Sequence, residues 1–263
     1  MNALTEAPQR AEGHLERLRR TELDAVMRWV QPGSRVLELG GGSGYQASLM
    51  AQRGLDVTSI DIPAGVRTPR QHFFDVQEYD GRTIPAEDAS FDVVFSSNVL
   101  EHVPHLDHMT DEIRRVLKPG GLSVHIMPSS AWRWWTSVSY LPQFAKRILR
   151  IGRKPAAAAS SAPATPGTVR APAWWRAFTL PFEPHGEYAN AISELYEFRR
   201  NKWRRLFEAH GFAIVAAEPI RLFYTGNMIA PSMTGHTRER LSRLLGPGSN
   251  VIVARKPVRS VPG

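Results

Sequence analysis

The 263-residue chain contains no cysteine, so disulfide bonds, thiolate metal sites and a cysteine nucleophile are all excluded. It also contains no run of about 18 apolar residues, which is the length that a membrane-spanning helix requires. Residues 1–14 lack the apolar core of a secretory signal peptide. We therefore expect a cytoplasmic protein, and a peripheral position at the inner face of the membrane is compatible with these absences.

Acidic residues are missing from residues 129–182, which hold eight Lys and Arg and no Asp or Glu. The charge of this segment, +8, equals the formal net charge of the whole chain, so the remainder is close to neutral. Nucleic-acid binding by the whole protein is not favoured by a charge excess that is so local. The same segment contains five of the seven tryptophans, which makes it aromatic as well as basic.

Glycine clusters directly after one apolar run. Residues 36–45 (VLELGGGSGY) place a glycine-rich turn after a short strand, and the next apolar run, residues 57–62, contains Asp61 near its end. Glycine allows the backbone to turn tightly and to approach a ligand closely. A helix beginning between Ser43 and Gln46 would direct its N-terminal amides at that ligand. In a doubly wound sheet, ligands bind beyond the carboxyl ends of the strands at such a turn.

The spacing of the glycines distinguishes two classes of nucleotide site. A dinucleotide-binding turn follows the pattern G-x-G-x-x-G, which would need a glycine where Tyr45 stands. The pattern in this chain is E-x-G-x-G-x-G, formed by Glu38, Gly40, Gly42 and Gly44. It resembles motif I of the class I S-adenosylmethionine-dependent methyltransferases.

Further motifs extend this resemblance. Residues 91–98 (FDVVFSSN) indicate a buried strand, residues 99–103 (VLEHV) follow it, and residues 112–121 (EIRRVLKPGG) close a helix before another strand. In this order the motifs are similar to those of type 11 methyltransferases over residues 34–128, with weaker similarity over residues 192–256. The resemblance implies an α/β fold with a doubly wound, Rossmann-like sheet of seven strands. The sheet would be mostly parallel with the last strand antiparallel, and a lid insertion would follow strand five.

The resemblance and the composition together divide the chain into five parts. They are an N-terminal helical cap (1–31), a cofactor-binding core (32–128), an aromatic and basic insertion (129–190), a C-terminal part of the core (191–257) and a tail (258–263). Within the insertion, residues 155–172 are rich in Ala, Pro and Ser, a composition typical of disordered linkers. The remaining elements predicted for the core are a strand over 72–79, a helix over 192–210 and strands over 212–220 and 250–256.

S-adenosylmethionine is the cofactor that the resemblance implies. The residues implied to bind it are Glu38, Gly40, Gly41, Gly42, Gly44, Asp61, Ile62, Ser97 and Asn98. The glutamate and the glycines would shape the pocket for the methionine moiety, and Asp61 would accept both ribose hydroxyls. Ser97 and Asn98 would line the sulfonium end of the cofactor.

Two carboxylates compete for the exocyclic amine of the adenine. The family usually places an acidic residue after the third strand, and Asp75 and Asp80 both compete for that role. Asp80 is slightly favoured because its spacing to Pro85 is that of the family. Gly81 beside it would then supply a backbone contact.

Glu101 and His102 form the candidate catalytic pair. The pKa of a histidine lies near neutrality, so His102 could take a proton from a hydroxyl or amine that attacks the methyl group. Packing or hydrogen bonding at the start of a helix explains His102 equally well. Some quinone-pathway and RNA-terminus methyltransferases bind a divalent cation through E-x-x-E-H, but Asn98 stands at the first position of that pattern in this chain. We therefore predict no metal site.

The insertion is the expected place of the acceptor. The candidate substrate-binding residues are Trp132, Trp135, His185 and Tyr188. Three interpretations of the aromatic and basic side chains stay open: packing, a lid over an amphiphilic or acidic acceptor such as a lipid-linked sugar or a secondary metabolite, and nucleic-acid binding. Residues 129–154 and 173–182 would also suit a peripheral membrane contact.

The sequence thus predicts an enzyme that transfers a methyl group by an SN2 reaction to an oxygen or nitrogen of a small-molecule, sugar or lipid-linked acceptor. One alternative is a protein that binds the cofactor without turnover. Another is an RNA or protein methyltransferase that uses the basic insertion as a tether. The absence of an N/D-P-P-Y motif after residues 91–98 disfavours methylation of base or amide nitrogens.

Overall fold

The computed structural model describes residues 13–63, 72–138, 191–222 and 235–258. The chain forms two compact units, and each is assembled from separate stretches of sequence. The first unit comprises residues 1–126, 206–217 and 251–263. The second unit comprises residues 127–205 and 218–250.

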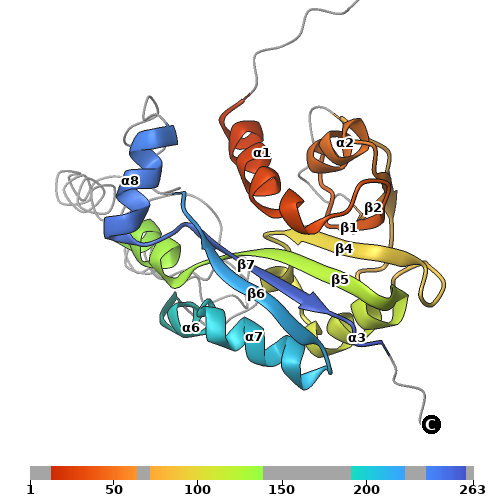
Figure 1. Cartoon of the computed structure of the whole chain (residues 1–263). Helices are drawn as coiled ribbons and strands as arrows, with labels where there is room; N and C mark the ends of the chain where they lie inside the picture. Colours follow the sequence, from red (N-terminus) through yellow and green to blue (C-terminus); the bar gives the residue numbers. More distant parts are fainter. Residues whose placement is uncertain (1–12, 64–71, 139–190, 223–234, 259–263) are drawn as a thin grey trace, which may run out of the picture. The chain divides into compact units, whose positions relative to one another are not determined.

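A seven-stranded sheet forms the centre of the fold (Figure 1). Its strands are β1 (Arg35–Leu39), β2 (Asp56–Asp61), β3 (Val76–Glu78), β4 (Phe91–Ser97), β5 (Leu117–Pro128), β6 (Ala213–Ile220) and β7 (Ser249–Arg255). They are arranged in the order β3-β2-β1-β4-β5-β7-β6, and the pairs from β3 to β5 are parallel. β7 runs against β5, because Gly120 N at the start of β5 donates to Lys256 O at the end of β7 at 2.8 Å. The predicted seven-stranded, mostly parallel sheet is confirmed.

The strand order reverses between β1 and β4, which creates a switch point at the carboxyl ends of these two strands. Both strands are buried on both faces, as parallel strands covered by helices usually are. Val36, Leu37 and Leu39 of β1 and Val94 and Phe95 of β4 are at most 1% exposed. This burial explains why both segments read as near-continuous apolar runs in the sequence.

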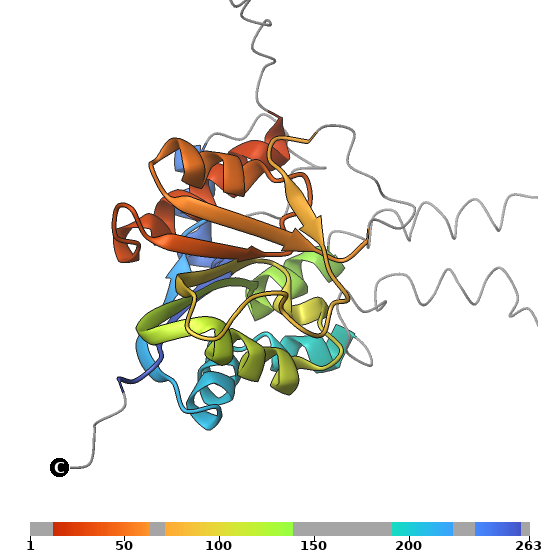
Figure 2. The ribbon, with the colours of Figure 1, turned by 90° about the vertical axis from the view of Figure 1, so that its right-hand side faces the viewer.

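Helices cover both faces of the sheet in the first unit. α1 (His14–Val26) and α2 (Tyr45–Gln52) lie on one face, and α3 (Leu106–Val116) lies on the other (Figures 1 and 2). In α3, Met109, Ile113 and Val116 are at most 1% exposed. Their spacing of four and three residues places them on one side of the helix, which therefore packs against the sheet. The short 3₁₀ turns η1 (Met27–Trp29) and η2 (Leu100–His102) follow α1 and β4.

A histidine is buried in the middle of the sheet. His125 of β5 shares hydrogen bonds with Ser96 Oγ at 2.7 Å and Ser123 Oγ at 2.5 Å, and its ring stacks on Phe207 at 5.2 Å. Burial lowers the pKa of His125 to about 3, so the ring is neutral at physiological pH. The imidazole is therefore a satisfied core group, although it lies beside two serines.

The second unit contains helical residues 130–138, α6 (Ala191–Glu197) and α8 (Gly235–Leu245), and it shares α7 (Arg200–Ala209) with the first unit. A buried ion pair joins two of these helices: Arg133 Nε lies 2.6 Å from Glu194 Oε2, and the two side chains are 4% and 0% exposed. Trp135 Nε1 donates to Leu245 O at 2.8 Å, which ties the first helical segment to α8.

Several predicted elements can be compared with the structure. The strands predicted over 212–220 and 250–256 are confirmed by β6 and β7. The strand predicted over 72–79 is shorter, since β3 holds only three residues. Most of the predicted insertion, including the linker over 155–172, lies outside the described residues. The other predicted part boundaries stay predictions.

The single helix predicted over 192–210 is wrong, because the chain forms α6 and α7 with a break at Phe198 and Arg199. Phe198 and Trp203 are 0% and 2% exposed, and residues five apart point to different sides of a straight helix. The break allows both aromatic side chains to be buried. No helix in the described part of the chain is both long and apolar enough to cross a membrane.

Candidate functional site at the carboxyl edge of the sheet

The loop between β1 and α2 holds its glycines in conformations that other residues rarely adopt. Gly40, Gly42 and Gly44 have φ angles of 72°, 56° and 73°. The loop is fixed to β2, because Gly40 N and Gly41 N donate to Ile60 O at 2.8 and 3.2 Å. The glycines predicted from the sequence therefore form one bent loop at the carboxyl end of β1.

The space around this loop also requires glycine. A Cβ atom at Gly40 would lie 2.3 Å from Val99 Cγ2, and one at Gly41 would lie 2.0 Å from Ser59 Oγ. A Cβ atom at Gly42 would meet no atom of the described residues within 4 Å. The loop therefore has a crowded inner side and an open outer side at Gly42, a shape that suits a backbone that approaches a ligand.

Glu38 of β1 is buried beneath the loop and is only 2% exposed. Its Oε2 accepts a hydrogen bond from Ser59 Oγ at 2.6 Å. Burial raises the pKa of Glu38 to about 7, although the hydrogen bond from Ser59 opposes this change. The carboxyl group therefore changes its charge near neutral pH, which is unusual for a glutamate.

Asp61 ends β2 and is linked directly to the glycine loop. Its Oδ2 accepts from Gly42 N at 2.7 Å, and its Oδ1 accepts from Ile62 N at 2.7 Å. Ile62 is 57% exposed, so an apolar side chain stands open beside a carboxylate. Three of the predicted cofactor residues, Gly42 of the loop with Asp61 and Ile62 at the end of β2, are thus brought together.

Asp80 and Gly81 follow β3 and lie near the same place. Tyr79 N donates to Asp61 O at 3.0 Å, and a Cβ atom at Gly81 would lie 3.0 Å from Ile62 Cγ2. Asp75, in contrast, precedes β3. The contacts of the residues that flank Asp80 therefore favour it over Asp75 as a neighbour of Asp61.

The carboxylate of Asp80 is held in a turn. Its Oδ1 accepts from Arg82 N and Thr83 N, both at 2.8 Å. These backbone hydrogen bonds, the one from Thr83 first, lower the pKa of Asp80. Asp80 is therefore ionised at neutral pH and has a defined orientation, although the side chain is exposed.

The carboxyl end of β4 meets residues of α1. Ser97 Oγ accepts from Arg19 at 3.0 Å and donates to Glu22 Oε2 at 3.1 Å. Asn98 Nδ2 donates to Glu22 Oε1 at 3.3 Å, and Asn98 has a φ angle of 54°. A non-glycine residue in this conformation is uncommon and is enriched at functional sites.

Arg19 and Glu22 were not predicted from the sequence as site residues. Glu22 is 1% exposed, and it lies one helical turn before Val26, which is 0% exposed. A carboxylate on the apolar side of a helix is rarely buried unless it is paired. The place of Glu22 on the apolar side of the helix is the feature of the sequence that could have identified it as a site residue.

The candidate catalytic pair lies in η2, directly after β4. Glu101 is 1% exposed, while the His102 side chain is 42% exposed, and Nε2 of the imidazole lies 3.9 Å from Oε1 of Glu101. The two residues are therefore adjacent at the same edge of the sheet as Ser97 and Asn98. A histidine that is accessible and lies next to a carboxylate can exchange protons with a ligand.

The predicted acceptor residues belong to the second unit or lie outside the description. Trp132 packs with its ring centroid 6.4 Å from that of Phe198, and the indole N–H of Trp135 is bound by a backbone carbonyl. These contacts favour the packing interpretation for both tryptophans. His185 and Tyr188 lie outside the described residues. Within the described ranges, no three His, Asp or Glu side chains are grouped to hold a metal ion.

Comparison with known proteins identifies the part of the chain that carries this site. Residues 37–125 match the family model of a methyltransferase domain. The chain is 38% identical over 102 residues to an uncharacterized methyltransferase of Mycobacterium sp. (strain JLS), a match that covers 35% of this chain and 38% of the relative. It is 37% identical over 112 residues to the demethylmenaquinone methyltransferase of Renibacterium salmoninarum, which covers 41% of this chain and 46% of the relative. The chain thus spans less than half the length of these curated relatives.

Solved structures of methyltransferases have a similar fold. The crystal structure of an S-adenosylmethionine-dependent methyltransferase from Mesorhizobium loti superposes with a TM-score of 0.50 at 16% identity, covering 89% of this chain and 97% of that protein. The strand order with an antiparallel β7, the glycine loop and the matched family model agree with one another. Residues 37–125 therefore match a methyltransferase domain in sequence, and the fold is that of the class I S-adenosylmethionine-dependent methyltransferases, whose cofactor is S-adenosylmethionine.

Proposed function

We propose that the protein is a methyltransferase that transfers the methyl group of S-adenosylmethionine to an oxygen or nitrogen of a small-molecule, sugar or lipid-linked acceptor. The observation that carries this proposal is the hydrogen bond between Gly42 N and Asp61 Oδ2 at 2.7 Å. It joins the open side of the glycine loop to the carboxylate that ends β2. A ligand at this point would meet backbone and carboxylate together, next to the switch point of the sheet.

The residues at this edge fit the shape of the cofactor. The open side of Gly42 leaves room for a ligand against the loop, while the crowded positions of Gly40 and Gly41 keep the loop close to the strands. Asp61 would accept the ribose hydroxyls, since each carboxylate oxygen has further lone pairs beyond its one backbone bond. The exposed side chain of Ile62 would contact one face of the adenine.

The adenine amine and the amino-acid end of the cofactor would meet charged groups of this chain. Asp80, ionised and held in its turn, would accept a hydrogen bond from the amine. Near β4, Arg19 is in hydrogen-bonding distance of Ser97, so its guanidinium would lie close to the cofactor's carboxylate. Glu38 would balance the positive charge of the ammonium group, which favours the ionised form of this carboxyl.

Methyl transfer requires little covalent chemistry from the protein. The bound cofactor supplies a methyl group that its sulfonium already activates. The protein holds the reacting groups in line and excludes water, and Asn98 with its strained backbone would help to fix the geometry beside β4. His102 would accept the proton of the attacking hydroxyl or amine, and the adjacent Glu101 carboxylate would stabilise the imidazolium.

The acceptor class rests on the composition of residues 129–182 and on one relative. The tryptophans and basic side chains of that segment suit an acceptor with an apolar body and an acidic group. The demethylmenaquinone methyltransferase among the relatives makes quinols a reasonable first set of acceptors to test. The same segment would allow peripheral contact with a membrane in which such acceptors reside.

The test is calorimetric titration of S-adenosylmethionine and S-adenosylhomocysteine into the wild type, Asp61→Ala and the matched variant Asp56→Ala. Asp56 begins the same strand, is exposed, and contacts Arg35 rather than the loop. Two hydrogen bonds to a charged acceptor are worth about 3 kcal/mol, so we expect Asp61→Ala to weaken binding about 100-fold and Asp56→Ala to leave it unchanged. Circular dichroism verifies that all three proteins are folded.

Wild-type protein that binds neither ligand would overturn the proposed cofactor site. Cofactor binding without methyl transfer to any acceptor in a broad screen would favour the alternative of a binding protein without turnover. Transfer to RNA or to protein, dependent on low salt, would favour the alternative in which the basic insertion is a tether.

A further inference from the structure

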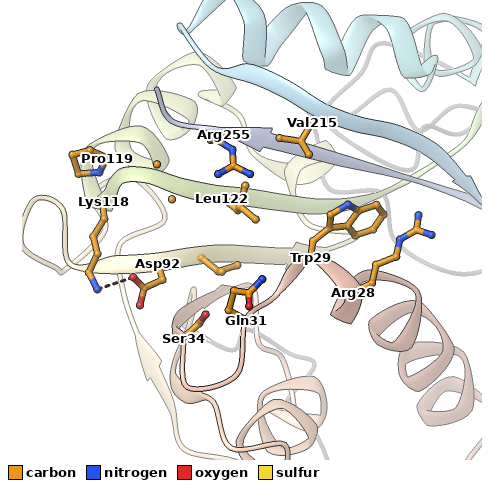
Figure 3. Close-up of a pocket in the computed structure, with 13 residues that line it drawn as sticks. Arg28, Trp29, Gln31, Ser34, Asp92, Lys118, Pro119, Leu122, Val215 and Arg255 are labelled. Carbon is orange, nitrogen blue, oxygen red and sulfur yellow. Dashed lines mark hydrogen bonds and ion pairs between the residues drawn. The ribbon is translucent and has the colours of Figure 1, made fainter. Parts of the chain in front are cut away.

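A cavity of about 500 Å³ lies at the opposite edge of the sheet from the proposed cofactor site (Figure 3). Its lining residues include the amino-terminal ends of parallel strands, residues of η1 and the last residue of β7. Ser34 precedes β1, Asp92 and Lys118 are the second residues of β4 and β5, and Arg255 ends the antiparallel β7. None of these residues belongs to the carboxyl edge, so the cavity is a separate site within the first unit.

Positively charged side chains outnumber negatively charged ones in the lining of the cavity. Arg28, Lys118 and Arg255 line it together with a single carboxylate, that of Asp92. Lys118 Nζ donates to Asp92 Oδ1 at 2.7 Å, and Asp92 Oδ2 accepts from Arg35 N at 2.9 Å. The carboxylate is therefore matched by the lysine, and the Arg255 guanidinium adds a positive charge to the cavity.

Arg255 is the cation that is available to bind a ligand. Its side chain is exposed, and it makes no hydrogen bond or ion pair with any residue in the described ranges. Figure 3 shows its guanidinium directed from β7 towards Leu122 and the interior of the cavity. A guanidinium presents a planar fork of donors, which matches the oxygens of a phosphate or a carboxylate.

Part of the lining of the cavity is aromatic and apolar. The Arg28 guanidinium lies 4.0 Å from the centroid of the Trp29 ring, a cation–π contact that holds the indole in place. Leu122 and Val215 line the same cavity, and Val215 is 43% exposed although it is apolar. The cavity thus offers a flat, apolar surface within the same space as a free guanidinium.

We propose that this cavity binds a small organic anion, in which a phosphate or carboxylate group is attached to a ring or other apolar body. The anionic group contacts Arg255, and the apolar body lies against Trp29, Leu122 and Val215. The volume falls within the range of about 300–1,000 Å³ that small-molecule sites occupy. The inference uses no residue of the proposed methyltransferase site and stands independently of it.

The test uses phenyl phosphate and benzoate as probes, titrated calorimetrically into the full-length wild-type protein at constant ionic strength. Inorganic phosphate and phenol serve as comparators, since each carries only one half of the proposed ligand. We expect saturable binding of one probe molecule per chain, with a dissociation constant on the order of 1 mM or below. Both comparators should bind about ten-fold more weakly or not at all. Comparators that bind as well as the probes would overturn the proposal.

The variants are Arg255→Gln and Arg28→Gln, with Arg205→Gln as the matched control. Arg205 is an exposed arginine of α7 that does not line the cavity. Loss of a charged hydrogen bond should weaken phenyl phosphate binding about ten-fold in Arg255→Gln. The control should bind the probe as the wild type does, and S-adenosylhomocysteine titration should be the same in every variant.

Three outcomes would overturn the inference. They are no saturable binding to the wild type, unchanged probe binding in both Arg255→Gln and Arg28→Gln, and displacement of the probe by S-adenosylhomocysteine in direct competition. The last result would place the probe in the cofactor site instead. Because S-adenosylhomocysteine binding is measured separately, a failure of this cavity to bind anions is distinguishable from a failure of the proposed methyltransferase site.

Discussion

Glu38 gives the site a titratable group within the neutral range. Its carboxyl group is buried under the glycine loop, and burial raises its pKa from the ordinary value of 4.5 to about 7. The folded protein therefore holds this proton more tightly than the unfolded chain does. The contribution of the group to the free energy of unfolding is fully present below about pH 4.5 and is lost as the pH rises through about 7.

We expect the free energy of unfolding of the wild type to fall between pH 5 and 8, by up to about 3 kcal/mol from this residue. Glu38→Gln keeps the shape of the side chain without the titration, so the corresponding part of the pH dependence should disappear. Urea denaturation at four pH values measures the difference. The variant Glu78→Gln, at an exposed position of β3, is the control. An identical pH profile in wild type and Glu38→Gln would contradict the prediction.

At the level of whole elements, His210, which directly follows α7, forms hydrogen bonds with α3. His210 Nδ1 lies 2.7 Å from Asp111 Oδ1, and Nε2 lies 3.1 Å from Asp107 Oδ1. Burial lowers the pKa of His210, but the hydrogen bonds to Asp111 and Asp107 outweigh it and raise the pKa above its ordinary value of 6.5. The protonated imidazole therefore stabilises the folded state, and the stabilisation is lost as the pH rises above 6.5 and through this raised pKa.

Replacement of His210 by Gln should destabilise the protein at pH 6 and have little effect at pH 9. The difference should stay below about 1 kcal/mol, because the two aspartates are largely exposed to solvent. Denaturation of the wild type, His210→Gln and Asp111→Asn at both pH values tests it. His108→Gln, an exposed histidine on α3, is the control. A loss in His210→Gln that is equal at pH 6 and pH 9 would show that charge is not involved.

The elements that could be predicted from the sequence are those whose cause is local. The glycines at 40, 42 and 44 need positive φ angles, and β1 and β4 are apolar because both faces are covered. Residues of the site that depend on distant contacts could not be found in this way. Ser59 matters only because β2 lies beside β1, and Arg19 only because α1 packs at the end of β4. The motifs predict the loop at which the cofactor would bind but not which side chains of other elements would surround it.

The break between α6 and α7 has the same kind of cause. Helical periodicity alone favours one long helix, since no proline or glycine interrupts residues 192–210. The need to bury both Phe198 and Trp203 decides otherwise.

The predicted acceptor residues form a further group that pattern reasoning could not place, because no motif describes the aromatic and basic stretch. Of these, Trp135 donates its indole N–H to the backbone carbonyl of Leu245.

Across the whole molecule, the excess of positive over negative charge is confined to residues 129–182, whose net charge of +8 equals that of the entire chain. We expect this segment to govern association with anionic lipid. Each basic residue near such a surface contributes about 1 kcal/mol, so replacement of Lys146, Arg147 and Arg150 by Ser should lower the partition coefficient roughly 100-fold.

Sedimentation with phosphatidylglycerol vesicles, compared with phosphatidylcholine vesicles, measures this partition. The control replaces three arginines outside the segment, Arg205, Arg221 and Arg240, by Ser, which removes the same net charge. Equal losses in both triple variants would mean that only the total charge counts. No binding of the wild type to anionic vesicles would exclude the membrane contact altogether.

The two compact units are joined in a way that limits how such a protein can be recombined. The chain passes between them after Ile126, Arg205, Ala217 and Asn250, so neither unit is one continuous stretch of sequence. A hybrid that kept the first unit and received the other from a relative would need four junctions, three of them within the strands β5, β6 and β7 and one within α7. Exchange of acceptor specificity by a single crossover would cut through the sheet, so the two units are expected to be inherited, and to be engineered, together.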